Sequence, residues 1–394
     1  MRGGISLGRI FGINVRLDWS WLLIFFLVTW NLANVFGDLQ PDWNNALNWL
    51  LAVVAALLFF GSVLAHELAH SVVARARGIP VRNIVLFLFG GVSNIERDPD
   101  SPKSEFLITV VGPLTSFALG IIFLLLARAI AGAVDASVDD PEGMVRAMGP
   151  TAVMLYWLGS VNILLGAFNL IPGFPLDGGR ILRSILWAAT NNLRKATEWA
   201  SYVGQIIAWL LIIGGISMVF GAEIPFFGTG LIGGLWLAFI GWFLNSASVQ
   251  SYQHIVIQDV LEDVPVTRMM RANPPTVPSE ISLSTLVYDH MMGTSDHAFP
   301  VVDGGTRLVG MVTLEDVRKV PRTEWDTTLT RDIMTPASDL SSTTPDADAI
   351  DVWNKLQQRD VAQIPVMQGD RLVGLVRRTD IVRWLQLTSE LSTG

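Results

Sequence analysis

Apolar residues gather in six long runs within the first 250 positions of the chain, and polar residues mark the loops between them. A helix that crosses a membrane needs about 20 mostly apolar residues. The pattern therefore predicts six membrane-spanning helices, at about Leu17–Phe36, Ala46–Ala74, Phe106–Ala131, Thr151–Ile171, Ala200–Phe220 and Leu231–Leu244. No such run occurs after position 250, which indicates a second domain of a different kind.

The charges divide the chain at nearly the same place. Up to His254 there are 15 acidic and 14 basic residues, which leaves 20 acidic and 13 basic residues of the total 35 and 27 for the remainder. The first part is thus poor in charge, and the second is an ordinary acidic domain without a basic run that would indicate nucleic-acid binding. The chain has no cysteine, so His, Asp and Glu would have to hold any transition metal.

Lysine and arginine near the predicted helix ends indicate the orientation in the membrane. Basic residues precede the first predicted helix, follow the second and lie between the fourth and fifth: Arg2, Arg9, Arg16, Arg75, Arg77, Arg82, Arg180, Arg183, Arg194 and Lys195. The loop over 37–45 has no basic residue, and the loop over 132–149 has only Arg146 among several acidic residues. We therefore expect a multi-pass protein of the cell membrane with both ends on the cytoplasmic side.

The second predicted helix contains the motif His66-Glu67-Leu68-Ala69-His70 inside its apolar run. Ionisable residues within a membrane span are costly, so they indicate a function. Histidines at i and i+4 share one helix face and can bind one zinc ion, and Glu67 beside them is placed to deprotonate a water molecule. The alternative is a pair of buried histidines that are satisfied by hydrogen bonds.

A third metal ligand is needed, because a catalytic zinc ion usually has three protein ligands. The remaining histidines, His254, His290 and His297, lie in the second part of the chain or at its edge, so a carboxylate of the membrane part is expected. Asp177 is the candidate, since the prolines and glycines around it interrupt the helix and let the side chain turn inward. It could equally be the N-cap of a helix that starts near Gly178.

The last 130 residues contain an internal duplication with a period near 64, in which AFPVVDGGTRLVGMVTLEDV resembles QIPVMQGDRLVGLVRRTDIV. The repeats span about 264–322 and 328–388. Each reads as an α/β unit that buries too little apolar surface alone, so we expect the two to pack as one domain.

These repeats look like a pair of CBS motifs. Such pairs often bind adenine nucleotides such as ATP or AMP, with an aspartate on the ribose and a Ser or Thr three residues earlier. Thr313 and Asp316 fit this pattern, whereas the second repeat has Asp380 with Arg377 in the hydroxyl position, where an arginine could favour phosphate. The alternatives are a module that forms a homodimer without ligand, and aspartates that only cap helices.

HELAH in the second predicted helix and NLIPGFPLDGGR after the fourth resemble the site-2 protease family of intramembrane zinc metalloproteases, in its prokaryotic subgroup with tandem CBS domains. The resemblance covers essentially the whole chain. It implies that His66, His70 and Asp177 bind zinc and that Glu67 acts as general base and then general acid. It also implies that Asn169 donates to the oxyanion or holds the substrate backbone, although Asn169 could instead make only a helix–helix hydrogen bond.

A β-prone stretch lies between the second and third predicted helices, with strands expected at Ile84–Phe89 and Val92–Ile95 and a turn at Gly90-Gly91. The family resemblance implies a membrane-embedded sheet in this region. A free strand edge beside the metal could pair with an unwound substrate by β-augmentation. The hairpin could equally be structural and pack only against helices.

The sequence therefore predicts a polytopic α-helical membrane protein with a small membrane-embedded β-hairpin or sheet over 1–250, followed by an α/β tandem CBS domain over 251–394. The expected function is an intramembrane zinc endopeptidase that cuts transmembrane segments of single-pass membrane proteins, regulated by its CBS domains. The alternative is a CBS-regulated transporter whose metal is structural or transported.

Overall fold

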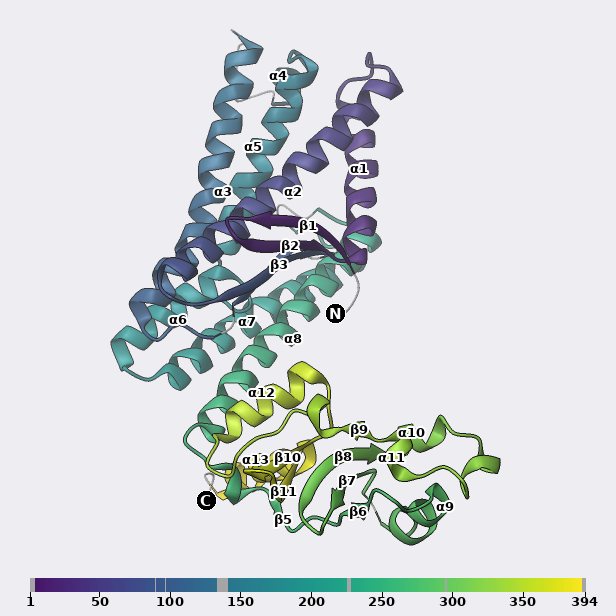
Figure 1. Cartoon of the computed structure of the whole chain (residues 1–394). Coiled ribbons are helices and arrows are strands. Elements are labelled where there is room, and N and C mark those ends of the chain that lie inside the picture. Colours follow the sequence, from purple (N-terminus) through teal and green to yellow (C-terminus); the bar gives the residue numbers. More distant parts are fainter. Residues whose placement is uncertain are drawn as a thin grey trace. The chain divides into compact units, whose positions relative to one another are not determined.

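The protein divides into two compact units, Met1–Gln253 and His254–Gly394, each with its own core. The computed structural model describes residues 4–88, 90–95, 97–132, 141–224, 228–294 and 296–391. The first unit combines long helices with a four-stranded sheet, and the second is a mixed α/β unit around a seven-stranded sheet (Figure 1).

Long helices dominate the first unit. The described helices that begin in this unit are α1 Trp19–Leu39, α2 Asn45–Ala76, α3 Pro102–Ala131, α4 Pro141–Arg146, α5 Pro150–Asn169, α6 Asp177–Thr190, α7 Leu193–Val219 and α8 Leu231–Leu261. Among the described residues, six of them are long and apolar enough to cross a membrane: α1, α2, α3, α5, α7 and α8. The predicted six-span architecture is confirmed, although α8 continues past the expected end at Leu244.

Polar caps set the starts of the first two spans. Asp18 Oδ1 accepts a hydrogen bond from the Ser20 backbone N–H at 3.0 Å, directly before α1. Asn44 Oδ1 accepts one from the Leu47 N–H at 2.8 Å, directly before α2. Each cap satisfies a backbone donor that the first helical turn leaves free, so the apolar run begins with its backbone paired. The long α2 then carries the His-Glu motif in its C-terminal half.

A four-stranded sheet lies beside these helices, in the order β1-β2-β3-β4. Its strands are β1 Ile5–Ile10, β2 Ile13–Leu17, β3 Val81–Phe87 and β4 Gly90–Ile95. The strand pair over 81–95 was predicted, but Gly90 and Gly91 lie within β4, opposite Phe87 and Leu86, and do not form the turn. Phe89, the expected end of the first strand, is outside the described residues.

The N-terminal hairpin of this sheet was not predicted. Strand β2 runs parallel to β3, with Val15 opposite Ile84, so the start of the chain is tied to the segment after α2. Burial explains the pairing, because Ile13, Val15 and Ile84 are all fully buried. Strand β4 is the last strand of the sheet and its outer edge pairs with no other strand among the described residues.

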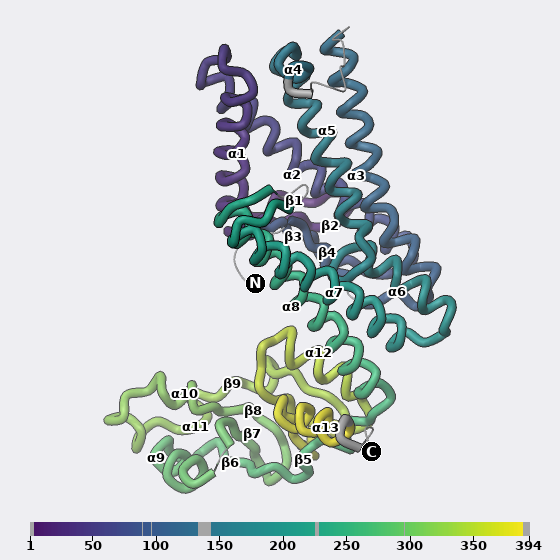
Figure 2. The backbone as a smooth tube through the Cα atoms, turned by 180° about the vertical axis from the view of Figure 1, so that it is seen from behind, coloured from purple at the N-terminus to yellow at the C-terminus, as the bar shows by residue number. Residues whose placement is uncertain are grey.

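Helix α6 lies against the N-terminal part of α3, as the reverse view shows (Figure 2). It begins directly after the loop that follows α5, so the chain turns back toward α2 and α3 at this point. Its buried residues are small or polar, namely Gly178, Gly179, Arg183 and Ser184, whereas the apolar Ile185 is 53% exposed. This short helix is therefore the element that brings a distant part of the chain to the His-Glu motif.

The second unit contains the two predicted repeats. Its strands are β5 Arg271–Ala272, β6 Val277–Pro278, β7 Ala298–Asp303, β8 Arg307–Thr313, β9 Thr335–Pro336, β10 Gln363–Gln368 and β11 Arg371–Arg377. Its α-helices are α9 Leu283–Thr285, which continues as a π-helical turn to Met291, α10 Leu314–Arg318, α11 Thr330–Ile333, α12 Ala349–Arg359 and α13 Arg378–Leu391.

The two repeats exchange their short entry strands. Strand β5 of the first repeat pairs with β11 of the second, and β9 of the second pairs with β8 of the first. Each repeat therefore completes the sheet of the other, and the apolar cluster around α12 and β10 also includes Val266 and Met269 of the first repeat. This exchange explains why one repeat alone would leave strand edges and apolar surface exposed.

Candidate metal centre

His66 and His70 lie on one face of α2 and are 5% and 7% exposed. Their Nε2 atoms are 3.1 Å apart, as expected for side chains one helical turn apart that point to a common centre. The predicted i, i+4 pair therefore forms inside the first unit, in surroundings where an unpaired polar atom is costly.

Asp177 brings a third ligand atom to the same point from α6. Its Oδ2 lies 3.0 Å from His66 Nε2 and 3.2 Å from His70 Nε2. The N-cap of α6 is Leu176, and no side-chain cap bond is made. The carboxylate of Asp177 therefore faces the two imidazoles and does not cap its helix. The ligand atoms of all three residues lie within 4.8 Å of one another.

Both imidazoles are held through their other ring nitrogen by α3. His70 Nδ1 donates to the backbone carbonyl of Ile108 at 2.7 Å. His66 Nδ1 lies 2.9 Å from Ser116 Oγ, which can accept from it. Partners of this kind fix the tautomer and the ring orientation of metal-binding histidines. They leave both Nε2 atoms free to bind a cation.

This donor set fits zinc. The Nδ1–H of His70 donates to a backbone carbonyl. In the neutral ring, Nε2 therefore carries a lone pair, which faces Asp177 Oδ2 and His66 Nε2. Only a cation or an extra proton between these atoms removes the repulsion. Two ligands at about 2.0–2.1 Å from a tetrahedral zinc ion lie roughly 3.3 Å apart, close to the distances of 3.0, 3.1 and 3.2 Å found here. Two imidazoles and a carboxylate would thus hold the ion and leave one position open.

Gly112 of α3 makes room for the centre. A Cβ atom at this position would lie 2.2 Å from His70 Nε2 and 2.7 Å from His66 Nε2. The backbone of α3 therefore closes one side of the site, and any larger residue would displace the imidazoles. Gly112 thus allows the close packing of α3 against the ligands.

Glu67 lies beside the histidines and contacts strand β4. Its Oε2 accepts a hydrogen bond from Ser93 Oγ at 2.7 Å, and Ser71 Oγ donates to Ser93 Oγ at 3.1 Å. Gly91 lies so close that a Cβ there would be 2.4 Å from Glu67 Cγ. The edge strand of the sheet therefore packs directly on the predicted general base.

Asn169 is the last residue of α5, and its side-chain amide donates to the Leu165 carbonyl of the same helix at 2.9 Å. The bond runs along one helix and does not join two. The side chain is partly exposed, so its amide can turn to another acceptor. Its role toward an oxyanion or a substrate backbone stays a prediction.

In the second unit, Thr313 and Asp316 form a capping box at the start of α10. Thr313 donates from its backbone N–H and its Oγ1 to Asp316 Oδ2, at 3.1 Å and 2.6 Å. Burial alone would raise the pKa of Asp316, but the hydrogen bonds from Thr313 and Lys319 hold it below its ordinary value. The helix-capping alternative therefore describes Asp316 as it stands here, and nucleotide binding by this residue stays a prediction.

Arg377 and Asp380, the equivalent pair of the second repeat, are joined by an ion pair of 2.8 Å. Arg377 also contacts Asp296 at 2.8 Å, and Arg271 contacts the other oxygen of Asp296 at 2.7 Å. Hydrogen bonding to Asp380 raises the pKa of Arg377 above its ordinary value. The positive charges of Arg377 and Arg271 are therefore compensated by the carboxylates of Asp380 and Asp296 within the unit.

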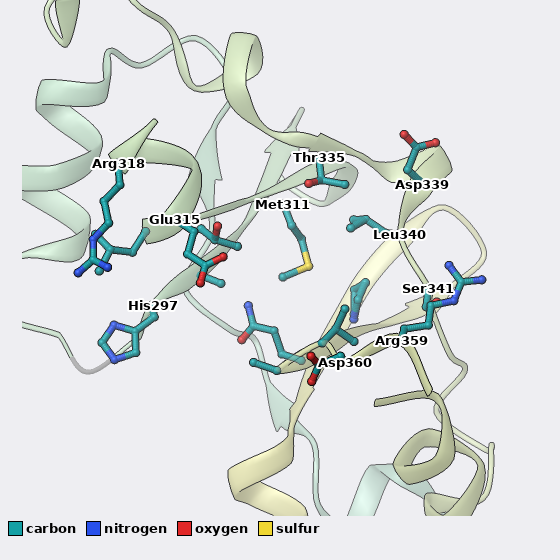
Figure 3. A pocket seen from close by; sticks show the side chains of 17 residues that line it. His297, Met311, Glu315, Arg318, Thr335, Asp339, Leu340, Ser341, Arg359 and Asp360 are labelled. Carbon is teal, nitrogen blue, oxygen red and sulfur yellow. The ribbon is translucent and has the colours of Figure 1, made fainter. Parts of the chain in front are cut away.

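A cavity of about 660 Å³ lies beside Thr313 (Figure 3). Its lining combines basic, acidic, hydroxyl and apolar side chains, among them Arg318, Arg359, Thr335 and Met311 and the acidic Glu315, Asp339 and Asp360. Figure 3 shows Arg318 and Arg359 on opposite sides of Met311. Asp316, Arg377 and Asp380 are not among its lining residues, so the structure brings only one of the four predicted ligand contacts to this cavity.

Comparison with known proteins identifies a family for each of the two units. The model of peptidase family M50 matches residues 54–211, and the CBS domain model matches residues 262–322 and 331–387. The chain is 34% identical over 388 residues to "Putative zinc metalloprotease Rip3" of Mycobacterium tuberculosis, covering 98% of this chain and 94% of that protein. It is 31% identical to "Putative zinc metalloprotease sll0528" of Synechocystis, covering 99% and 97%.

A solved structure, "Site-2 Protease from Methanocaldococcus jannaschii", is 30% identical and covers 64% of this chain and 95% of that chain, with a TM-score of 0.42. The membrane-length helices and the family matches define a multi-pass membrane zinc metalloprotease with a tandem CBS domain. The chain belongs to peptidase family M50, as a site-2 type zinc metalloprotease with tandem CBS domains. This membership sets aside the transporter alternative.

Sequence reasoning missed the residues that support the ligands. Ser116 and the Ile108 carbonyl orient the histidines, and Ser93 holds Glu67. The only available signal for Ser116 was its place four residues after Gly112 within an apolar run, where a polar residue calls for a partner. Ser93 carried no such signal, since a serine in a short strand near a turn is ordinary.

The packing at Gly112 predicts that Gly112→Ala weakens zinc binding but keeps its fold, because the new methyl group would collide with the Nε2 ends of two imidazoles. We expect the zinc affinity to fall by at least about ten-fold, measured by competition with a chromophoric chelator, with an unchanged circular dichroism spectrum. Gly61→Ala on α2 is the control, since a Cβ there meets nothing within 4 Å. Full zinc binding by Gly112→Ala would contradict this account of the site.

Proposed function

We propose that the protein is an endopeptidase that hydrolyses peptide bonds in transmembrane segments of single-pass membrane proteins, with zinc held by His66, His70 and Asp177. The observation that carries the proposal is the convergence of these three ligand atoms, beside Glu67, within a bundle of membrane-length helices. A site in that location meets substrates that are themselves in the membrane. Residues 1–250 would form the protease domain and 251–394 the regulatory domain.

Glu67 would move the protons of the reaction. When bound, the zinc ion supplies the Lewis acidity that polarises the peptide carbonyl and eases deprotonation of water. The Glu67 carboxylate takes the proton from the attacking water and returns it to the leaving amine. Ser93 Oγ donates to Oε2 of Glu67, which orients the carboxylate and leaves Oε1 to hold the proton.

The edge of β4 would hold the substrate in an extended form. A peptide bond within a helix is shielded by its own hydrogen bonds, so the substrate must unwind before it is cut. An unpaired strand edge supplies backbone donors and acceptors to an extended chain. Strand β4 has such an edge among the described residues, and its Gly91 and Ser93 contact Glu67. A substrate strand paired there would pass close to the base.

The proposal predicts that Glu67→Gln binds zinc with unchanged stoichiometry but does not cleave. The amide is nearly isosteric and keeps a hydrogen-bond acceptor for Ser93, yet it cannot take a proton at neutral pH. Cleavage of a panel of transmembrane peptides by the purified protein in lipid vesicles should fall by about 10²-fold or more. Ser93→Ala should reduce the rate by a smaller factor, and normal cleavage by Glu67→Gln would contradict the assigned base.

The basic residues near the helix ends support an orientation with the metal site toward the cytoplasm, in the cell membrane. The loop between α1 and α2 has no basic residue, whereas Arg75 and Arg77 end α2 and Lys195 lies in the first turn of α7. Cytoplasmic loops carry the excess of Lys and Arg. Both termini and the CBS domain would then face the cytoplasm.

Because the chain lacks cysteine, single cysteines can report this orientation. Asp38→Cys and Lys195→Cys both place a thiol at an exposed position outside the apolar runs. A membrane-impermeant maleimide applied to intact cells should label position 38 and should label position 195 only after permeabilisation. The reverse pattern would mean that the topology is inverted.

The second unit would bind one adenine nucleotide per chain, at the cavity beside Thr313. Its volume of about 660 Å³ is in the range of small-molecule sites. Arg318 and Arg359 can face phosphate groups, the carboxylates of Glu315, Asp339 and Asp360 can accept from ribose hydroxyls, and apolar side chains can contact the base. In the equivalent positions of the other repeat, Arg377 and Arg271 replace Thr313 and Thr335 and are tied to Asp296. That half supplies its own counter-charges and would stay without ligand.

Calorimetric titration of the full-length protein with AMP and with ATP tests this. One equivalent per chain is expected, and Thr313→Arg should abolish binding because it would project into the cavity an arginine like that of the other repeat. Arg377→Thr is the matched control and should leave the affinity of the first site within about two-fold. Two equivalents in the unmodified protein, or unchanged binding by Thr313→Arg, would contradict the single site.

A further inference from the structure

One face of helix α3 supports the metal centre along its length. Its positions 105, 108, 112 and 116 are three or four residues apart, so they lie on a single helical stripe. Ile108 accepts the Nδ1 hydrogen bond of His70, Gly112 packs on both Nε2 atoms, and Ser116 contacts His66 Nδ1. Three members of the stripe thus fix the two histidines, which leaves Glu105 without a role at the ligands.

Glu105 is paired with Arg183 of α6. Glu105 is completely buried and Arg183 is 5% exposed. Arg183 Nε donates to Glu105 Oε1 at 2.7 Å, and its Nη2 contacts the same oxygen. The pair therefore joins the first turn of α3 to the helix whose first residue is Asp177.

Arg183 also touches the loop before that helix. Its guanidinium lies 5.4 Å from the ring centre of Phe174, which is 6% exposed and precedes Asp177 by three residues. Its Nη2 is 3.6 Å from Asp98, in the segment before α3. Arg183, which belongs to the helix that begins at Asp177, therefore contacts α3, the segment before α3 and the loop that leads to Asp177.

Stability alone is a poor reason for this ion pair. Removing two charges from water costs several kcal/mol per ion, and packed apolar residues of similar size are often as stabilising or more so. Glu105 Oε2 adds to that cost, since it is buried and has no hydrogen-bond partner among the described residues. An ion pair does, however, fix the relative position of the two helices that carry it. The planar guanidinium of arginine presents several N–H donors in a fixed geometry, which neither apolar contacts nor lysine can provide.

We infer that Glu105 and Arg183 are positioning residues, which set Asp177 at the distance from His66 and His70 at which all three can hold one zinc ion. Neither residue touches the ligand atoms, so they act through the placement of α6 on α3. The inference rests on the proposed zinc site. With it, a single face of α3 arranges every zinc ligand: two histidines directly and the aspartate through the ion pair.

Zinc affinity in two backgrounds tests the inference independently of proteolysis. Arg183→Lys keeps the charge but loses the fork, and we expect it to lower the zinc affinity of the full-length protein by about 10–100-fold, measured with a chromophoric chelator. The same change in an Asp177→Asn background should cost less than about two-fold, because the residue through which Arg183 acts no longer supplies a carboxylate. Cobalt bound to Arg183→Lys should show the visible absorption of cobalt bound to Asp177→Asn.

Arg180→Lys is the matched control. Arg180 is on the same helix and carries the same charge, but its Nε is 3.7 Å from Glu105 Oε1 and the side chain is partly exposed. It should keep the zinc affinity within about two-fold. Glu105→Gln serves as a second variant if Arg183→Lys does not fold. If neither variant folds, the ion pair is needed for the stability of the protein, and the inference is overturned.

Two binding results would also overturn it. An unchanged zinc affinity in Arg183→Lys, or an equal loss in both backgrounds, would mean that the pair does not act through Asp177. If Asp177→Asn alone binds zinc normally, Asp177 is not a zinc ligand, and the zinc site of the proposed function is itself wrong. The experiment therefore distinguishes an error in the role of the Glu105–Arg183 pair from an error in the zinc ligands.

Discussion

The first unit is organised around one electrostatic constraint: two imidazole nitrogens and a carboxylate oxygen meet within 4.8 Å inside an apolar bundle. Such atoms repel one another unless a cation or a proton lies between them, and burial strengthens the repulsion because little solvent screens it. The surroundings hold the arrangement in place. The Ile108 carbonyl and Ser116 orient the rings, the absent side chain of Gly112 admits them, and the backbone turn after α5 delivers Asp177. The bundle thus holds the three ligand atoms at a spacing at which a bound metal ion is favoured.

Sequence patterns predicted the parts of this site that depend on local geometry. The i, i+4 spacing of His66 and His70 follows from one helical turn, so it could be read directly. Asp177 could not be assigned from local rules, since an aspartate near a helix start is both a cap and a potential ligand. The choice is made by a contact between residues 66 and 177, which no local pattern contains. The same applies to Glu105 and Arg183, although an acidic residue at the start of an apolar run was a visible signal.

The fold, like the site, was predictable only where it depends on local sequence patterns. Six apolar runs gave the spans, and the 64-residue repeat indicated the paired α/β units, because length and repetition are properties of the sequence itself. The hairpin β1–β2 was missed because Ile13 and Val15 are buried by a parallel pairing with β3, far along the chain. The repeats also look alike in sequence but differ in charge arrangement. Arg377 is neutralised by Asp296 and Asp380, while Thr313 borders an open cavity, so a nearly symmetric pair offers two unequal halves.

X-ray absorption at the zinc K-edge on the purified full-length protein tests the central claim most directly. The account predicts one zinc ion per chain with nitrogen and oxygen neighbours at about 2.0–2.1 Å, and the outer-sphere scattering of two imidazole rings. Replacement of Asp177 by Asn should alter the first coordination sphere and leave the imidazole scattering in place. A site with three imidazoles, or a spectrum that does not respond to position 177, would place the metal elsewhere and contradict the structure-based assignment.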